Sequence, residues 1–208
     1  MKTCLKCYNL FNRHTDLMPY SPCPIFQCDG KVVEIDDNIL QTIIELNQKG
    51  YPTEFCCAGH TWGNDPYIVF ENGVYINAFP NLPKAFKSEI IHTGALRIYK
   101  SIPSSSIIET HKLLMDASID LMEWSDRLKP SMLFMADFEL NDQAKLSEIK
   151  NEIQQRFSIT TGLTEMKDGS KGLILSTLIS LKSSKTLERK IKSFANEKGV
   201  PVSIDIID

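Results

Sequence analysis

Four of the six cysteines lie within the first 28 residues, and they form two pairs. The pairs are Cys4 with Cys7, in the run CLKC, and Cys23 with Cys28, in the run CPIFQC. Two pairs of thiolates on tight turns are a ligand set for a tetrahedral Zn²⁺ ion. The segment between the pairs is too short to build its own core, so the metal would hold it folded. We predict a zinc ribbon over residues 1–30, with a structural Zn²⁺ as cofactor because four protein ligands leave no open position.

Other uses of these cysteines remain open at this stage. Two disulfides or four unrelated thiols are alternatives, although both suit a reducing compartment poorly. An iron–sulfur cluster is a third, although the compact cluster spacings are absent. His14 is a candidate substitute ligand. The start Met1-Lys2-Thr3-Cys4 lacks an apolar core followed by a cleavage site, so we expect a cytoplasmic protein.

The composition excludes some classes of partner. The net charge is -3, whereas a protein held mainly by nucleic-acid phosphates needs surplus Lys and Arg. No run approaches the ~20 apolar residues that cross a bilayer, so we expect no membrane insertion. A chain of 208 residues can form two compact units, and residues 101–106 are its one linker-like segment.

The second half alternates strand and helix patterns. Apolar residues alternate over 131–140, as in a strand, and then recur every three or four residues up to Phe157, as in a helix capped by Asn141 or Asp142. The same reasoning predicts strands over 158–166 and 172–181 joined by an Asp-Gly turn at 167–170, a helix ended by Gly199, and a last strand over 202–206. This βαββαβ order predicts a ferredoxin-like domain.

A linking helix is predicted over residues 105–128, capped from within Ser104–Ser106. Its apolar stripe consists of Ile108, Met115, Ile119 and Met122, and we expect it to pack between the two halves. The expected fold class is therefore α+β, with these parts: a zinc ribbon at 1–30, a small α/β unit at 31–103, and the linking helix plus the ferredoxin-like domain at 104–208.

The small α/β unit has the looser pattern. Asp36 is expected to cap a helix that Gly50 ends. The other expected elements are strands over 31–35, 53–57, 66–71, 74–79 and 95–99, with a hairpin turn at Asn72-Gly73 and a short helix over 82–90.

The other two cysteines lie in the run TEFCCAGH, residues 53–60. Adjacent Cys56 and Cys57 point to opposite faces of a strand, so one is expected in the core and one at the turn ending in His60. Three functional interpretations compete: a thiolate nucleophile activated by His60, a metal held by Cys and His with ligands from elsewhere, or turn N–H groups that cradle a phosphate or carboxylate. The alternative without function is that both cysteines are buried apolar residues and His60 caps the turn.

This region resembles a group of uncharacterised bacterial and phage proteins that join a zinc ribbon to a KGY-x-T-x-x-CCSGH element. The matching residues are Lys49-Gly50-Tyr51, Thr53, Cys56-Cys57 and Gly59-His60, with Ala58 where serine is usual, followed by Leu82-Pro83 with Phe86 and by Arg97 on a strand. A more distant likeness is to the methyltransferase of tRNA wybutosine synthesis, whose motif T-x-x-SCSGR follows an acidic residue and a helix. That motif is matched at Thr53, Cys57 and Gly59, which implies at most a shared architecture.

Arg97 can bind an anion near Gly59 through its guanidinium, or it can pair with a local carboxylate. We predict binding of a small anionic or nucleotide-like ligand, or of a partner protein, at the turn. The candidate residues are Thr53, Cys56, Cys57, Gly59, His60 and Arg97. The alternative is a Cys/His-dependent enzyme acting on nucleotide or nucleic acid.

Two further partners are considered for the second half of the chain: nucleic acid and a second copy of the protein. A basic cluster on the last helix suggests nucleic-acid binding, but the pattern agrees better with a helix face exposed to solvent. Its members are Lys182, Lys185, Arg189, Lys190 and Lys192. A homodimer through the ferredoxin-like sheet is the other.

Overall fold

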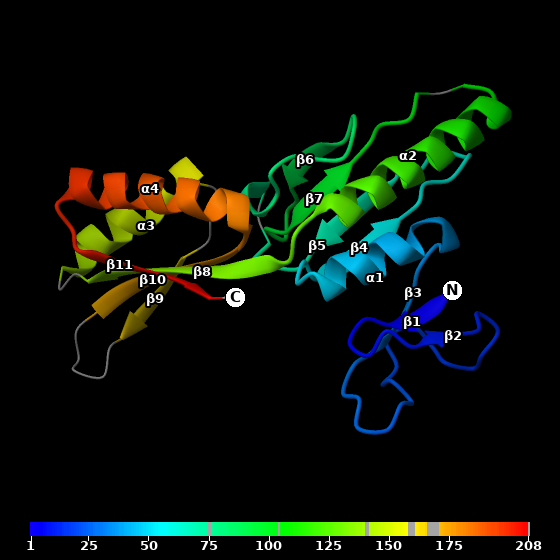
Figure 1. Cartoon of the computed structure of the whole chain (residues 1–208), viewed down its shortest axis with the longest axis horizontal. Coiled ribbons are helices and arrows are strands. Elements are labelled where there is room, and N and C mark those ends of the chain that lie inside the picture. The colour runs from blue at the N-terminus through cyan, green and yellow to red at the C-terminus, as the bar shows by residue number, and fades with distance from the viewer. Residues whose placement is uncertain (75, 104, 140–141, 158–160, 166–170, 208) are drawn as a thin grey trace. The chain divides into compact units, whose positions relative to one another are not determined.

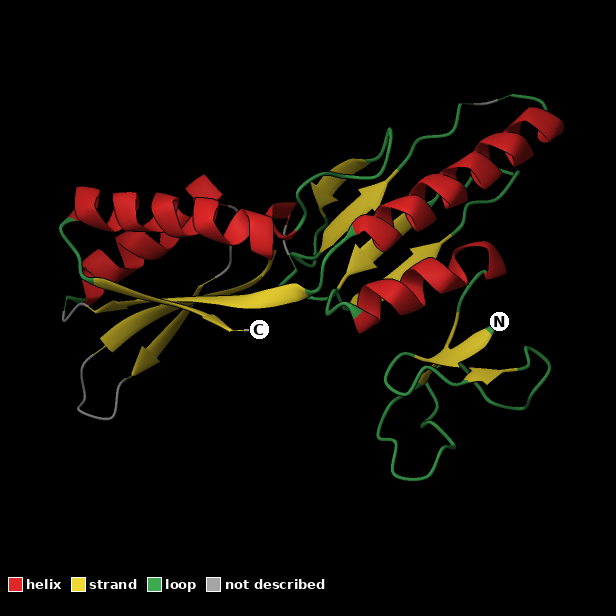
Figure 2. Cartoon of the chain, viewed as in Figure 1, coloured by secondary structure: helices red, strands yellow, loops and turns green. Residues whose placement is uncertain are grey.

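A computed structural model describes residues 1–74, 76–103, 105–139, 142–157, 161–165 and 171–207, and it is a mixed α+β protein as predicted (Figures 1 and 2). Two compact units divide the chain. Unit 1 comprises Met1–Phe70, Leu82–Glu89 and Arg97–Leu128, and unit 2 comprises Glu71–Asn81, Ile90–Leu96 and Lys129–Asp208. The domain boundaries proposed after residues 30 and 103 remain predictions. Among the described residues, every helix is too short or too polar to cross a membrane.

The amino-terminal part of unit 1 is a small three-stranded sheet of order β2-β1-β3. The strands are β1 (Lys2–Cys4), β2 (Leu10–Phe11) and β3 (Val32–Glu34). All three residues of β1 are buried, and Thr3 Oγ1 donates to the carbonyl of Asn9. Strands of two or three residues bury little apolar area, so this sheet needs another source of stability.

The rest of unit 1 is built on a sheet of order β4-β5-β7-β6. Its strands are β4 (Thr53–Cys57), β5 (Tyr67–Phe70), β6 (Lys87–Ile90) and β7 (Leu96–Tyr99). The 3-10 turn η1 (Asp37–Ile39) leads into α1 (Leu40–Gln48), and α1 packs beside α2 (Ile107–Arg127) (Figure 1). The predicted caps of α2 are confirmed, because Ser106 and Glu109 form a reciprocal capping box.

Three expectations for these elements are wrong. The stripe expected to bury α2 lies on its exposed face, with Ile108 83% and Met122 47% exposed, whereas Leu114, Leu121 and Trp124 are buried. Where a hairpin strand was expected over 74–79, the described residues include the 3-10 turn η2 (Ile76–Ala78). The segment 82–90 is not a helix: Ala85 has a φ of 61°, which interrupts a helix, and β6 follows it.

The carboxy-terminal part of unit 2 is a four-stranded antiparallel sheet of order β11-β8-β10-β9. Its elements are β8 (Ser131–Glu139), α3 (Gln143–Phe157), β9 (Thr161–Glu165), β10 (Lys171–Ser180), α4 (Leu181–Lys198) and β11 (Val202–Ile207). Both helices cover the same face of this sheet (Figure 2). Phe134, Leu146, Leu175 and Phe194 belong to one buried cluster between helices and sheet. Asp142 Oδ1 accepts from the N–H groups of Ala144 and Lys145, as the capping prediction requires, and the turn expected at 167–170 lies outside the described residues.

Candidate functional site

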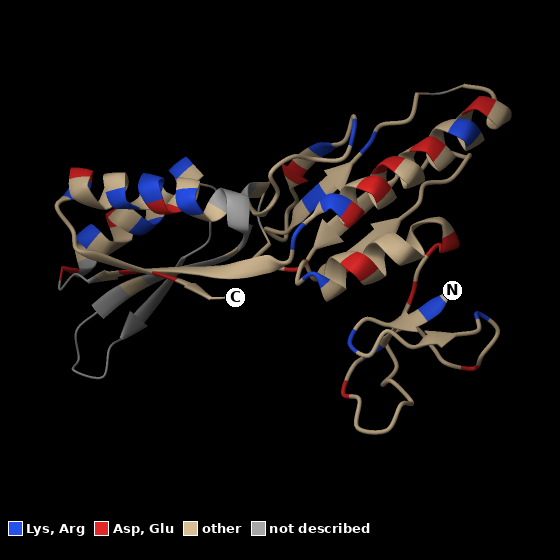
Figure 3. Ribbon diagram, in the orientation of Figure 1, with Lys and Arg blue, Asp and Glu red and all other residues tan. Residues whose placement is uncertain are grey.

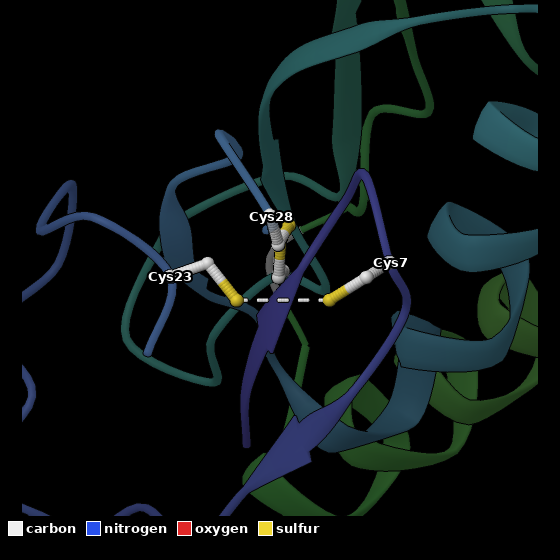
Figure 4. Close-up of side chains that lie close together, drawn as sticks. Cys7, Cys23 and Cys28 are labelled. Carbon is white, nitrogen blue, oxygen red and sulfur yellow. Dashed lines mark hydrogen bonds between the residues drawn. The ribbon is translucent and has the colours of Figure 1, made fainter. Parts of the chain in front are cut away.

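The four amino-terminal cysteines come together although the chain separates them into two pairs. Their sulfur atoms all lie within 4.8 Å of one another, with 3.7 Å between Cys4 and Cys28 and 3.6 Å between Cys7 and Cys23. Figure 4 shows Cys7, Cys23 and Cys28 pointing toward one another. A tetrahedron with metal–sulfur bonds of about 2.3 Å has edges of about 3.8 Å. All four cysteines are unbridged, which opposes the disulfide alternative. The cluster could therefore hold a metal ion.

Gly30 gives these sulfurs their space. A Cβ atom at residue 30 would lie 2.5 Å from Cys4 Sγ and 3.3 Å from Cys28 Sγ. The backbone around it is fixed, because the N–H of Cys23 donates to the Gly30 carbonyl at 2.8 Å. Only glycine fits where the chain passes this close to the sulfurs, and this is the fit expected of a built metal site.

The protonation of the cluster also suits a cation. Hydrogen bonds from Asn9 lower the pKa of Cys7 to about 6, whereas burial raises the pKa of Cys23 to about 12. Without a metal these thiols would not ionise together, and a divalent cation is what allows several thiolates to coexist. His14, considered as a substitute ligand, lies instead on the wall of a separate cavity of ≈ 480 Å³ that Arg13 and Asp37 also line.

The second cysteine pair is divided between two sides of β4. Cys56 and Thr53 line a small cavity of ≈ 120 Å³ together with Tyr67. Thr53 is fixed by Asn47 at the end of α1, whose Nδ2 donates to Thr53 Oγ1 at 2.8 Å. This bond joins helix to strand, so the structure gives the Thr53 hydroxyl a structural partner. Its predicted ligand-binding role stays a prediction.

Cys57 faces a different group of residues. The ligating atoms of Asp36, Cys57 and His60 all lie within 4.8 Å of one another. Asp36 Oδ2 accepts from the N–H of Ala58 at 2.9 Å. The sequence reasoning assigned Asp36 to a helix cap, but its side chain makes no capping bond. The tRNA wybutosine-synthesis motif follows an acidic residue and a helix, and this order is the signal that could have identified Asp36 as a site residue.

The turn itself depends on Gly59. Its φ is 84°, and a Cβ there would collide with Leu114 and lie 2.9 Å from the carbonyl oxygen of Asn64. The turn N–H groups already have acceptors: Gly59 N donates to Cys57 Sγ at 3.3 Å, and His60 N donates to the Asn64 carbonyl at 2.9 Å. An anion cradled by these N–H groups would have to displace those acceptors, which disfavours that interpretation.

The thiols of this segment are protonated near neutral pH. Burial raises the pKa of Cys56 to about 12, and burial also raises the pKa of Cys57, helped by the neighbouring Asp36 carboxylate. A nucleophilic thiolate needs the opposite surroundings, with a cation or helix amino terminus that lowers the pKa. The two thiols thus lack the activation that a Cys/His-dependent enzyme requires.

His60 also belongs to an aromatic pair beside a cavity. Its ring stacks on Trp62 with centroids 5.1 Å apart and planes 3° from parallel, and Trp62 is 81% exposed. The cavity has a volume of ≈ 340 Å³. Its walls include His60, Trp62, Asn64, Asp65, Ser105 and Thr110. None of the described residues that line it is Lys or Arg.

Arg97 has local partners. Its guanidinium pairs with Glu89 at 3.0 Å and lies over the rings of Tyr67 and Tyr99, 4.8 and 5.1 Å from their centroids. Pairing with a local carboxylate was the alternative to anion binding. Its predicted role in ligand binding stays a prediction.

The basic cluster of α4 is interleaved with acidic residues (Figure 3). Lys185, Arg189, Lys190 and Lys192 are exposed, and Lys192 pairs with Glu188 at 2.6 Å. The arrangement is typical of a solvated helix face.

No protein-family model and no curated protein matches this sequence. Solved structures that match include PelD 156-455 from Pseudomonas aeruginosa PA14 in complex with c-di-GMP, at 16% identity and a TM-score of 0.30, covering 85% of this chain and 67% of that chain. Another is PelD 158-CT from Pseudomonas aeruginosa PAO1, at 13% identity and a TM-score of 0.29, covering 85% and 68%. At these TM-scores neither a common fold nor a common ligand follows.

Proposed function

We propose that this chain is a zinc-binding protein in which Cys4, Cys7, Cys23 and Cys28 hold one structural Zn²⁺. The single observation that supports this most is the mutual approach of four sulfurs within 4.8 Å, around a glycine that leaves them room. When bound, the ion would cross-link β1 and the turn after it, through Cys4 and Cys7, to the loop before β3, through Cys23 and Cys28. The four cysteines fill its coordination shell, so it carries out no reaction.

We also infer that a small anionic or nucleotide-like ligand binds beside His60. A volume of ≈ 340 Å³ lies within the range of small-molecule sites, which is roughly 300 to 1,000 Å³. The exposed face of Trp62 offers a platform on which a base can stack. The Ser105 and Thr110 hydroxyls are bonded to each other at 3.0 Å, and this pair still has one free donor and acceptor lone pairs for a ligand. A partner protein at the same surface would use the same exposed aromatic group.

Kinship with the uncharacterised bacterial and phage zinc-ribbon proteins is part of the proposal. Two of the shared residues have structural roles that support it. Thr53 joins β4 to α1 through its hydrogen bond with Asn47, and Gly59 forms a turn in which no side chain would fit. We likewise propose a ferredoxin-like class for residues 131–207, supported by the order β11-β8-β10-β9 and by two helices on one face.

Metal analysis of the freshly purified full chain tests the zinc proposal. We expect tightly bound zinc, and the double variant Cys23→Ser/Cys28→Ser should lose one equivalent per chain because two ligands are gone. The matched control Cys56→Ser should keep the wild-type content, since that thiol lies outside the cluster. Iron with sulfide, or no metal lost by the double variant, would contradict the proposal.

Fluorescence titration with a panel of nucleotides tests the ligand proposal. The chain has two tryptophans, and the buried Trp124 serves as an internal reference for the exposed Trp62. A stacking ligand should quench Trp62, and Trp62→Ala should weaken binding by about tenfold or more, because a stacked base contributes ~1–3 kcal/mol. Equal affinity in Trp62→Ala would place the ligand elsewhere.

A further inference from the structure

We propose that Asp36, Cys57 and His60 form a second metal site, which takes Zn²⁺ or a similar borderline divalent cation and leaves at least one coordination position open. Asp36 lies between β3 and η1, Cys57 is the last residue of β4, and His60 lies in the turn that follows β4. Each provides a different donor: a carboxylate oxygen, a thiol sulfur and an imidazole nitrogen. All three donor types ligate Zn²⁺, and a set of three protein ligands is typical of sites that keep a position for water or a ligand.

The spacing of Cys57 and His60 is that of a metal-binding turn. They are separated by Ala58 and Gly59, which gives the run C-x-x-H, and the ribbon pair Cys4 and Cys7 has the same separation. Gly59 makes the turn tight through its φ of 84°, and the bridge between His60 and Asn64 closes it. These backbone constraints place the side chains of residues 57 and 60 close together in the absence of a metal ion.

Cys57 shares a local feature with the ribbon cysteines. In the ribbon, the backbone N–H two residues after each of Cys7, Cys23 and Cys28 favours the thiolate and acts to lower the pKa of that cysteine. The N–H of Gly59 bonds Cys57 Sγ in the same i to i+2 relation, at 3.3 Å. Such a bond stabilises a metal-bound thiolate. No backbone bond of this kind contributes at Cys56, so the two adjacent cysteines differ in the feature that ligation uses.

The other two ligands are also held in place. One oxygen of Asp36 accepts from Ala58 at 2.9 Å, which fixes the carboxylate, and the Trp62 ring fixes the plane of the His60 imidazole. Outer contacts of this kind orient metal ligands. Asp36 and a Cys57 thiolate would repel each other if left alone, and a cation bound between them compensates both charges.

A metal here would also complete the proposed ligand site. The cavity beside His60 has no described Lys or Arg on its walls, so an anionic ligand needs another group to bind it. A divalent cation held by Asp36, Cys57 and His60 has no net charge left, but its open coordination position can bind one anionic oxygen directly. Only this last step depends on the proposed ligand; the metal site itself does not.

Metal stoichiometry tests the site. The full chain is stripped of metal, reloaded with excess Zn²⁺, desalted and analysed for zinc per chain. We expect two equivalents in the wild type, and one in Cys57→Ser and in His60→Gln. The matched control Cys56→Ser should keep two, because it alters the neighbouring thiol and leaves the three ligands intact.

Asp36→Asn provides a variant that preserves the fold, since the amide oxygen can still accept from Ala58. It should bind the second equivalent at least tenfold more weakly in a Co²⁺ titration, while the spectrum of the four-thiolate ribbon is unchanged. One equivalent in the wild type would overturn the proposal, as would two equally tight equivalents in all three ligand variants. A failed nucleotide titration would leave this count unaffected, so the two proposals fail separately.

Discussion

The residues of the CCAGH region are held by contacts that span very different distances along the chain. Cys57, Gly59 and His60 were singled out because a thiol, a flexible glycine and an imidazole can bind a ligand or react, and their functional roles stay predictions. Asp36 was predicted to cap a helix because it directly precedes one. The hydrogen bond that its carboxylate accepts comes instead from Ala58, 22 residues along the chain. Local sequence patterns indicate helices and strands, but they do not predict contacts between residues that lie far apart in the sequence.

Tyr51, in the KGY run, gives a prediction about pH. Its ring is fully buried, and burial raises the pKa of its phenol to about 12. The folded pKa lies above the unfolded value of about 10, so this contribution to stability is complete below pH ~10 and is lost as the pH rises toward 12. Absorbance titration of the phenolates should show a late component near pH 12 that is missing in Tyr51→Phe. The idea fails if Tyr51→Phe removes a component that titrates near pH 10.

At the scale of elements, boundaries were predicted well where one strong local signal sets them. The capping box at Ser106 precedes the first residue of α2, and β4 spans the expected residues 53–57. Gly50 has a φ of 79° and follows the C-cap residue of α1, so the helix ends where expected. The buried face of α2 was wrong, because Leu114, Leu121 and Trp124 compete with a second apolar stripe on the same helix. Two stripes of similar strength cannot be ranked without knowing the partner surface.

The contact between α1 and α2 predicts a role for Lys49. Its Nζ donates to the carbonyls of Ser125 and Asp126 at 2.6 and 2.9 Å, and it pairs with Glu45 at 3.0 Å. A cation there gives a charged donor to two carbonyls at the carboxyl end of α2, and the Ser125 carbonyl also accepts from the N–H of Leu128. Lys49→Ala should lower the free energy of unfolding by about 1.5–3 kcal/mol, measured by urea denaturation.

Lys112→Ala is the matched control for that substitution. Lys112 lies on the exposed side of α2, so its removal should change the free energy of unfolding by less than about 0.5 kcal/mol. Equal effects of the two substitutions would show that the contacts of Lys49 do not join the helices.

At the scale of the whole molecule, stability is distributed unevenly along the chain. The core of residues 131–207 contains a large set of fully buried side chains, among them Phe134, Phe138 and Ile153. The sheet of β1, β2 and β3 has strands of only two or three residues. An apolar core can hold the first without help, whereas the second would depend on the proposed metal ion. The sequence supported both conclusions, because cysteine spacing and apolar periodicity are both local properties.

This unevenness predicts the response to chelation. Removal of zinc should raise amide hydrogen exchange over residues 2–34, because the backbone bonds of that sheet lose their cross-link. Peptides from β8, α3 and α4 should keep their protection, since their core contains no cysteine. Hydrogen-exchange mass spectrometry with and without a zinc chelator measures both regions in one sample, and reloading with Zn²⁺ should restore the original pattern. Unchanged exchange over 2–34 in metal-free protein would mean that the ribbon folds without its ion, and the cysteine cluster would then need another explanation.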